Sequence, residues 1–166
     1  MDTENVVHQL AIRVGNRLRE GRLLLATAES CTGGMVSAAI TDISGSSAWF
    51  ERGFVTYSNQ AKTDMIGVPP ELIEKHGAVS EAVARAMAEG ALRNSRAQLS
   101  LAITGVAGPG GGTAQKPVGT VSFAWTNRVH TLCQTLQFKG DRHQIRVQAT
   151  AHALRGVLTM LDEKEI

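Results

Sequence analysis

The sequence contains little cysteine, few aromatic residues and almost no net charge. Its two cysteines, Cys31 and Cys133, belong to no CxxC pair and are too few for a disulfide framework, so we expect two reduced thiols. The five histidines are scattered, with no HExxH motif and no carboxylates at metal-ligand spacing, which disfavours a metal site. A net charge of +2 and an aromatic content of 4% provide neither the basic stripe nor the stacking surfaces of a nucleic-acid-binding protein.

Long apolar runs are also absent. No stretch reaches the ~20 apolar residues that span a bilayer, and the N-terminal MDTENVVHQL lacks the basic start and apolar block of a signal peptide. We therefore expect a cytoplasmic protein with no membrane association. The length of 166 residues and the hydrophobic content of 43% are sufficient for one domain with a substantial core.

The pattern of hydrophobic residues predicts an alternation of helices and short buried strands. Runs such as LSLAIT (99–104) have the apolar character of a buried strand, and the spacer TNRV (126–129) between the last two strands favours an antiparallel hairpin. This order of elements predicts a three-layer α/β/α sandwich around a mixed sheet. The expected helices span residues 4–20, 33–41, 59–66, 69–76, 80–94 and 141–162, and the expected strands span residues 22–29, 50–58, 99–104, 119–125 and 130–138.

Three segments rich in polar residues or glycine follow the first three predicted strands. They are AESCTGG (28–34), TYSNQAK (56–62) and TGVAGPGGG (104–112). Ligands of open α/β sheets bind at the carboxyl ends of the parallel strands, where loops lead into helix N-termini. We therefore expect the three segments to meet at one edge of the sheet and to form a binding or catalytic site.

Ser30 lies between a predicted strand and a predicted helix. Its hydroxyl could act as a nucleophile, with the free amides of the helix start and the close approach allowed by Gly33 and Gly34 available to hold an oxyanion or a phosphate. Alternatively, Ser30 or Thr32 is only the N-cap of that helix.

A serine nucleophile requires a base, and no GxSxG motif or placed histidine supplies one. Lys62 follows the second predicted strand and could return to the same sheet edge, provided that burial or positive potential lowers its pKa from the usual ~10.4. Tyr57, the only tyrosine, could bridge Ser30 and Lys62 or relay a proton. The alternatives are an exposed lysine in a short helix and an ordinary tyrosine at the sheet rim.

Cys31 is a competing nucleophile. A thiol at a helix N-terminus has a lowered pKa, whereas a thiol that points inward is only a small core residue. Because adjacent residues leaving a strand tend to face opposite ways, we expect only one of Ser30 and Cys31 to lie in the site.

The glycine-rich loop over residues 105–117 does not fit the standard nucleotide motifs. Lys116 is preceded by Gln115 and followed by Pro117, which breaks the Walker pattern, and no register gives GxGxxG. The amides of residues 105–108 could still bind an anion, or the loop could be a flexible connection. Arg142 could clamp a phosphate, or it could be a surface arginine paired with Asp141.

Five blocks in order resemble the CinA C-terminal domain family, whose members include nicotinamide mononucleotide deamidases. The blocks are AESCTGG, GFVTYSNQAKTDMIGV, AITGVAGPGGG, KPVGTV and FKGDRHQIR, and the resemblance covers roughly residues 5–160. It implies one compact α/β/α domain over residues 1–166 with a five-stranded mixed sheet, without the additional molybdopterin-binding-like domain of many members. It also implies an amidohydrolase that converts nicotinamide mononucleotide and water to nicotinic acid mononucleotide and ammonia, with no metal and no cofactor.

The resemblance also implies roles for individual residues. Ser30 would be the nucleophile and Lys62 its base, with Tyr57 alongside. The expected substrate-binding residues are Glu29, Thr32, Gly33, Gly34, Thr104, Gly105 and Arg142. A non-catalytic module that binds a nucleotide or a partner protein is the alternative. Edge strands and apolar helix faces lead us to expect a homo-oligomer.

Overall fold

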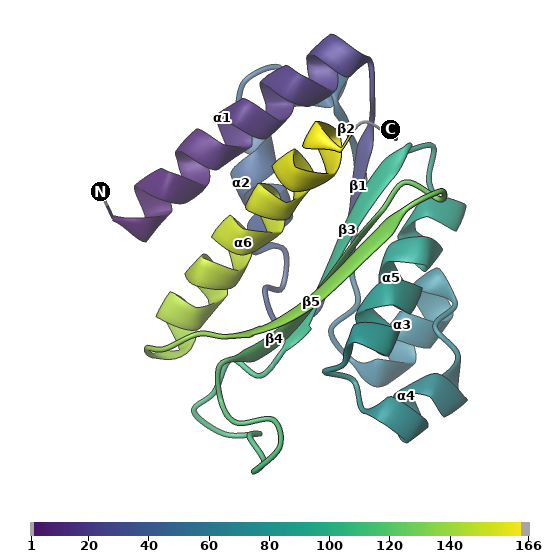
Figure 1. The fold of residues 1–166 in the computed structure, drawn as a ribbon, viewed down its shortest axis with the longest axis vertical. Helices are drawn as coiled ribbons and strands as arrows, with labels where there is room; N and C mark the ends of the chain where they lie inside the picture. Colours follow the sequence, from purple (N-terminus) through teal and green to yellow (C-terminus); the bar gives the residue numbers. More distant parts are fainter. Residues whose placement is uncertain (1, 164–166) are drawn as a thin grey trace.

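A computed structural model of the chain describes residues 2–163 and contains one five-stranded sheet with helices on both faces (Figure 1). The strand order is β2-β1-β3-β4-β5, with β2 and β3 parallel to β1, and with antiparallel pairs β3–β4 and β4–β5. The predicted mixed sheet and its final hairpin are therefore confirmed. The strands are β1 (Leu25–Glu29), β2 (Phe50–Val55), β3 (Leu99–Gly105), β4 (Thr120–Thr126) and β5 (Thr131–Gln137).

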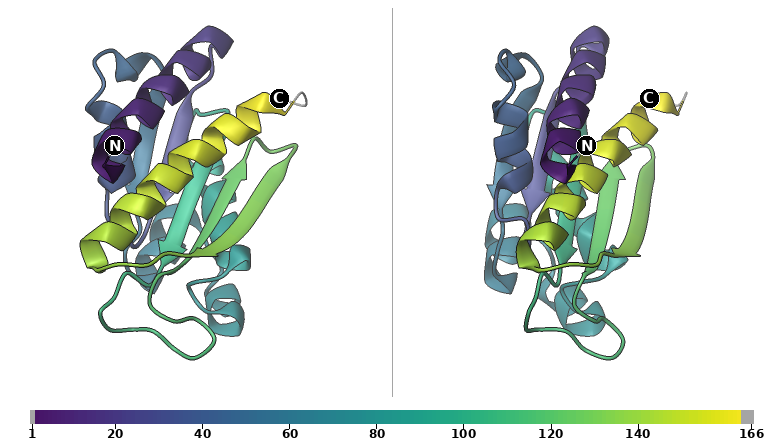
Figure 2. Two further views of the ribbon diagram at one scale, coloured as in Figure 1. Left: turned by 60° about the vertical axis from the view of Figure 1, so that its left-hand side comes forward. Right: turned by 90° about the vertical axis from the view of Figure 1, so that its left-hand side faces the viewer.

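In the described part of the chain, six α-helices form the outer layers of the predicted sandwich, on both faces of the sheet (Figures 1 and 2). One layer contains α1 (Thr3–Gly21), α2 (Met35–Thr41) and α6 (Arg142–Asp162). The other contains α3 (Asn59–Ile66), α4 (Pro70–His76) and α5 (Glu81–Arg93). Every predicted helix is present, with boundaries that differ by a few residues at most. A short 3-10 helix over Ser46–Ala48, just before β2, was not predicted from the sequence.

The central strands β1 and β3 are buried on both faces, as their continuous apolar sequences predict. Large side chains such as Leu99 and Leu101 pack toward α1 and α6, and Trp125 of β4 donates a 2.9 Å hydrogen bond to the Ala153 carbonyl of α6. On the other face, β1 and β3 contribute alanines to the core beneath α5. No helix within residues 2–163 is long and apolar enough to cross a membrane.

The strand directions decide where the site can form. The parallel strands β1, β2 and β3 end at the same edge of the sheet, and α6 begins there (Figure 1). The turn at residues 30–34, the turn at residues 56–58 and the loop at residues 106–119 therefore meet at this edge. These are the connections in which the sequence analysis placed its candidate residues.

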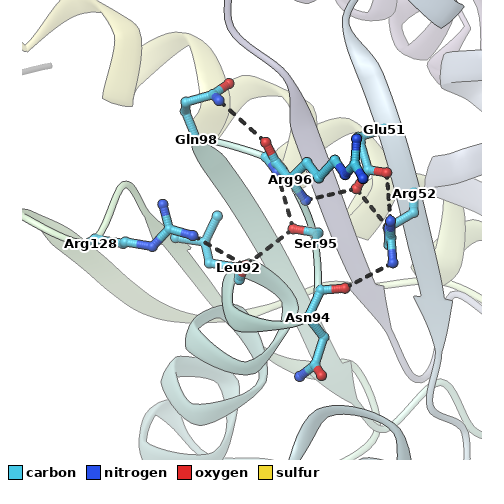
Figure 3. Close-up of polar contacts among 9 residues, drawn as sticks. Glu51, Arg52, Leu92, Asn94, Ser95, Arg96, Gln98 and Arg128 are labelled. Atoms are coloured by element: carbon cyan, nitrogen blue, oxygen red, sulfur yellow. Dashed lines mark hydrogen bonds and ion pairs between the residues drawn. The ribbon is translucent and has the colours of Figure 1, made fainter.

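The opposite edge of the sheet is closed by polar contacts around the C-terminus of α5 (Figure 3). Arg52 of β2 donates a 3.0 Å hydrogen bond to the Asn94 carbonyl, and Arg128 of the β4–β5 turn donates a 3.2 Å bond to the Leu92 carbonyl. Both carboxylate oxygens of Glu51 accept hydrogen bonds from the Arg52 guanidinium, at 2.7 and 2.9 Å, and one of them also accepts from the Arg96 amide. The arginines thus donate to carbonyls at the C-terminal end of α5, where intrahelical donors run out, and the Leu92 carbonyl also accepts from the Ser95 amide at 3.2 Å.

This cluster gives stability a dependence on pH. The hydrogen bonds from Arg52 lower the pKa of Glu51, so its stabilising effect is present above its unfolded-state pKa and is lost as the pH falls through the lowered value. We expect Glu51→Gln to lower Tm by about 1–3 °C at neutral pH and by progressively less in acid. Thermal unfolding across pH tests this, with Glu71→Gln on the exposed surface of α4 as control. An equal loss at every pH would contradict it.

Candidate active site

A cavity of about 310 Å³ opens at the carboxyl edge of the sheet. Residues from every connection at this edge line it. They are Ser30, Cys31, Tyr57, Asn59, Lys62, Ala78, Val79, Thr104, Gly105, Val106, Ala107, Gly108, Gly110, Gly111 and Arg142. The structure therefore brings together Ser30, Lys62, Tyr57, Thr104, Gly105 and Arg142 among the residues that the sequence analysis selected.

Ser30 and Lys62 are in direct contact inside this cavity. The Ser30 amide donates to the Ile103 carbonyl of β3, which fixes the serine at the end of β1. Lys62 lies in the first turn of α3, whose N-cap is Ser58. The Lys62 Nζ atom is 3.0 Å from Ser30 Oγ, and it donates further hydrogen bonds to the Thr56 carbonyl at 3.2 Å and the Tyr57 carbonyl at 3.4 Å.

Lys62 is 1% exposed and is among the largest fully buried side chains of the protein. Its position contradicts the alternative of an exposed surface lysine. Removal from water penalises the ammonium form, so burial lowers the pKa of Lys62. No carboxylate forms an ion pair with Lys62 among residues 2–163, and its hydrogen-bond partners are all neutral oxygens. The site therefore holds an amine that gives up its proton more readily than a surface lysine does.

The phenol of Tyr57 does not bridge Ser30 and Lys62. The Tyr57 side chain is 61% exposed, and its hydroxyl accepts a 3.2 Å hydrogen bond from Arg142. It is the backbone carbonyl of Tyr57 that contacts both Lys62 Nζ and Ser30 Oγ, each at 3.4 Å. The expectation of a proton relay through the phenol is thus not met by this geometry.

Arg142 lies at the rim of the cavity, where it connects two loops. It donates a 2.7 Å hydrogen bond to the Gly108 carbonyl in addition to its contact with Tyr57. The alternative of a surface pair with Asp141 is wrong, because Asp141 is the N-cap of α6 and forms a capping box with Gln144. The guanidinium is therefore available at the mouth of the cavity.

Glu29 lies beneath the cavity and is fully buried. Its carboxylate accepts five hydrogen bonds, from the Thr32 and Ser37 hydroxyls and from the amides of Gly34, Val36 and Ser37. These amides are free donors at the start of α2, so the carboxylate performs the capping that we had considered for Ser30 or Thr32. Glu29 does not line the cavity, and the geometry gives it a positioning role in place of the expected contact with substrate.

Thr32, Gly33 and Gly34 also lie outside the cavity lining. Gly33 and Gly34 adopt positive φ angles of 57° and 107°, which glycine accommodates without strain and which turn the chain sharply from Ser30 into α2. Arg146 of α6 holds the same turn from outside, donating to the Cys31 carbonyl at 3.1 Å and to the Thr32 carbonyl at 3.0 Å. The residues between β1 and α2 therefore shape the turn.

Cys31 lines the same cavity as Ser30, so the expectation that only one of them would lie in the site is wrong. Burial raises the pKa of the Cys31 thiol to about 12, which keeps it protonated at neutral pH and makes it a poor nucleophile. Its sulfur packs against Gly105, where an added Cβ would be 3.1 Å from Sγ and 2.8 Å from a methyl of Val121. Gly105 is thus required by close packing behind the cavity.

Three residues at or beside the cavity, Arg146, Asn59 and Ala78, were not predicted from the sequence. Arg146 was detectable, because it lies four residues after Arg142 in a predicted helix and therefore on the same face. Asn59 is the first residue of α3 and faces the cavity from the turn that also carries Tyr57. Ala78 contributes a carbonyl that accepts a 2.8 Å hydrogen bond from Thr104. A backbone contact of this kind leaves no pattern in a sequence.

A larger cleft, of about 640 Å³, lies between the N-terminal ends of α1 and α6. It contains a hydrogen bond between Glu4 and His143 at 3.0 Å but no nucleophile paired with a base among its lining residues, so the smaller cavity is the candidate active site. Within residues 2–163, no group of three or more His, Cys, Asp or Glu side chains is placed to hold a metal ion.

Comparison with known proteins gives the family. The family model described as the CinA C-terminal domain matches residues 7–161, which is nearly the whole chain. The chain belongs to the CinA C-terminal domain family. The nicotinamide-nucleotide amidohydrolase PncC of Escherichia coli K12 is 54% identical over 154 residues, which cover 92% of this chain and 93% of that protein. A CinA-like protein of Syntrophobacter fumaroxidans is 53% identical over 141 residues, but this CinA-family chain spans only 33% of its length.

Solved structures of CinA proteins have the same fold. The competence/damage-inducible protein CihA of Agrobacterium tumefaciens is 44% identical with a TM-score of 0.91, and the alignment covers 95% of this chain and 96% of that one. A CinA superfamily protein of Escherichia coli is 37% identical with a TM-score of 0.91, over 96% of this chain and 92% of that one. The α/β/α arrangement described above is therefore that of the CinA family.

The carboxylate of Glu29 should be essential for stability. In Glu29→Gln, an NH₂ group replaces one carboxylate oxygen. Its N–H donors then face the hydroxyl donors of Thr32 or Ser37 or the backbone amides at the start of α2, so these groups lose their acceptor. We expect a loss of about 1–3 kcal/mol in the free energy of unfolding, because buried groups are left without partners. Urea unfolding measures it, with Glu20→Gln on the exposed surface of α1 as the matched control. A variant as stable as the control would contradict this assignment.

Proposed function

We propose that this CinA-family protein hydrolyses the carboxamide of nicotinamide mononucleotide, yielding nicotinic acid mononucleotide and ammonia. The observation that carries the proposal is the contact of 3.0 Å between Ser30 Oγ and the buried amine of Lys62. The PncC proteins of Escherichia coli and Shigella flexneri, named as nicotinamide-nucleotide amidohydrolases, support the choice of substrate, since each is 54% identical over 92% of this chain.

Lys62 is proposed as the general base that activates Ser30. In its neutral form the amine has two N–H donors and one lone pair, and the structure offers two carbonyls and one hydroxyl around it. If the carbonyls of Thr56 and Tyr57 take the two donors, the lone pair is directed at Ser30. The serine proton then moves to Lys62 as Oγ attacks the carboxamide carbon.

The attack places negative charge on the carboxamide oxygen. Among the described residues, no oxygen accepts a hydrogen bond from the amides of Cys31 or Thr32, which directly follow the serine. We assign the amide of Cys31, which lines the cavity, as a donor to the oxyanion, whereas Thr32 does not line the cavity. A single donor of this kind typically contributes ~10² to 10³ in rate.

The remaining steps balance with Lys62 as the only proton carrier. The C–N bond breaks as the Lys62 ammonium gives its proton to the departing nitrogen. The nitrogen leaves as ammonia, and the acyl group remains as an ester on Ser30. Water then attacks the ester carbon, its proton moves to Lys62, and that proton returns to Ser30 Oγ as the acid is released. We assign the substrate phosphate to Arg142. Thr104 and the glycine loop line the cavity between the expected positions of the phosphate and the carboxamide.

Turnover should depend on both members of the pair. We expect Ser30→Ala and Lys62→Met each to reduce kcat at least ~10³-fold, because one removes the nucleophile and the other its base without emptying the buried site. Ammonia release from nicotinamide mononucleotide is the measurement, and Lys75→Met on the exposed surface of α4 is the control.

The same assay separates the alternatives. A wild-type protein that binds nicotinamide mononucleotide saturably without releasing ammonia would favour the non-catalytic binding module. A thiol enzyme would lose turnover in Cys31→Ala and retain it in Ser30→Ala. The raised pKa of Cys31 predicts the reverse, with Cys31→Ala reduced far less than Ser30→Ala.

The pH dependence of kcat/KM tests the role of Lys62 independently. A base acts only when it is deprotonated, so activity should fall as the pH decreases through the pKa of Lys62. Because burial lowers that pKa, the fall should be centred well below the ~10.4 of an ordinary lysine. A pH profile of wild-type ammonia release measures it. Activity that rises only near the pKa of a free lysine would contradict a desolvated base.

A further inference from the structure

Arg146 connects α6 to the turn that carries the nucleophile. Its Nε donates to the Cys31 carbonyl at 3.1 Å and its Nη2 to the Thr32 carbonyl at 3.0 Å, so one guanidinium holds two consecutive peptide groups. The side chain does not line the cavity, and it therefore does not touch a substrate bound there. Its contacts lie on the backbone immediately after Ser30.

Each peptide group joins the carbonyl of one residue to the amide of the next. The Cys31 carbonyl that accepts from Arg146 belongs to the same peptide group as the Thr32 amide. The Thr32 carbonyl shares its peptide group with the Gly33 amide, which donates at 3.0 Å to the Ser30 carbonyl. The Ser30 carbonyl in turn shares its group with the Cys31 amide. Both amides that lack an oxygen acceptor are therefore linked to the guanidinium, one directly and one through a second peptide group.

We propose that Arg146 is a positioning residue that strengthens the oxyanion-binding amide of Cys31 through these peptide groups. Hydrogen bonds in a chain polarise one another, so a cation bound to a carbonyl makes the amide of the same group a stronger donor. The inference rests on the proposed function, because it concerns the oxyanion of that reaction.

Glu29 holds the opposite side of the same turn. Its carboxylate binds the amides of Gly34, Val36 and Ser37, further along the chain, and not those of Cys31 and Thr32. The anion thus fixes the start of α2 while the cation binds the carbonyls of the two residues that follow the serine. This division leaves the Cys31 amide, beside Ser30, without an oxygen acceptor among the described residues.

The prediction is that Arg146→Gln lowers kcat about tenfold with little change in KM. The loss is smaller than the ~10² to 10³ of a deleted donor because the amide itself remains. Arg146→Lys keeps the charge but cannot donate to both carbonyls in the fork geometry, so its kcat should be intermediate. Arg155→Gln, on the exposed surface of the same helix, is the matched control.

Two inhibitors separate oxyanion stabilisation from a general effect on the fold. Pyridine-3-boronic acid can accept Ser30 Oγ at boron and place a hydroxyl where the oxyanion forms, whereas nicotinic acid mononucleotide binds without a tetrahedral centre. We expect Arg146→Gln to raise the inhibition constant of the boronic acid about tenfold and to leave that of the mononucleotide within twofold. If Arg146→Gln does not fold, as judged by circular dichroism, the same comparison is made with Arg146→Lys.

The outcomes are distinct. A kcat for Arg146→Gln within twofold of the Arg155→Gln value overturns the inference, and so does a parallel loss of affinity for both inhibitors. Absence of ammonia release by the wild type overturns the proposed function alone. The affinity of Ser30 for the boronic acid can still be measured from its ¹¹B resonance and compared between the wild type and Arg146→Gln.

Discussion

The site depends on the burial of one amine. Lys62 is enclosed by the sheet edge and α3, no carboxylate of residues 2–163 forms an ion pair with it, and the resulting penalty on the ammonium form separates it from an ordinary lysine. The same enclosure brings Nζ to Ser30 Oγ and surrounds it with two backbone carbonyls. A more exposed lysine at this position would not have its pKa lowered in this way. Burial therefore favours the neutral amine that the proposed role of Lys62 as a base requires.

Two side chains hold the turn at residues 30–34 from opposite sides. Glu29 binds the amides at the start of α2, and Arg146 binds the carbonyls of Cys31 and Thr32 that precede them. Two side chains of opposite charge thus fix one short turn. Neither side chain lines the cavity. The arrangement shows how buried charge can define the geometry of a site that it does not enter.

Most helices and strands could be predicted from the spacing of apolar residues, because this spacing differs between an amphipathic helix and a buried strand. The boundaries of β1 and β2 were less accessible, since Arg22 to Leu24 and Thr56 to Ser58 carry strand-like residues in connecting segments. The short helix at Ser46–Ala48 has no apolar repeat to detect. In the site, the roles considered for Thr32 and the Tyr57 phenol failed because the chemistry of a side chain does not reveal which partner it meets.

By itself, the sequence determined the order of the elements, the three segments at one sheet edge and the pairing of Ser30 with Lys62 as candidates. These follow from local patterns and from the rule that parallel strands end together. Only the tertiary structure decided that Cys31 shares the cavity, that Tyr57 contributes its carbonyl, that Glu29 caps α2 and that Arg146 reaches back to the turn. Each of these depends on contacts across distant parts of the chain, and burial and hydrogen-bond direction exist only once those parts are packed.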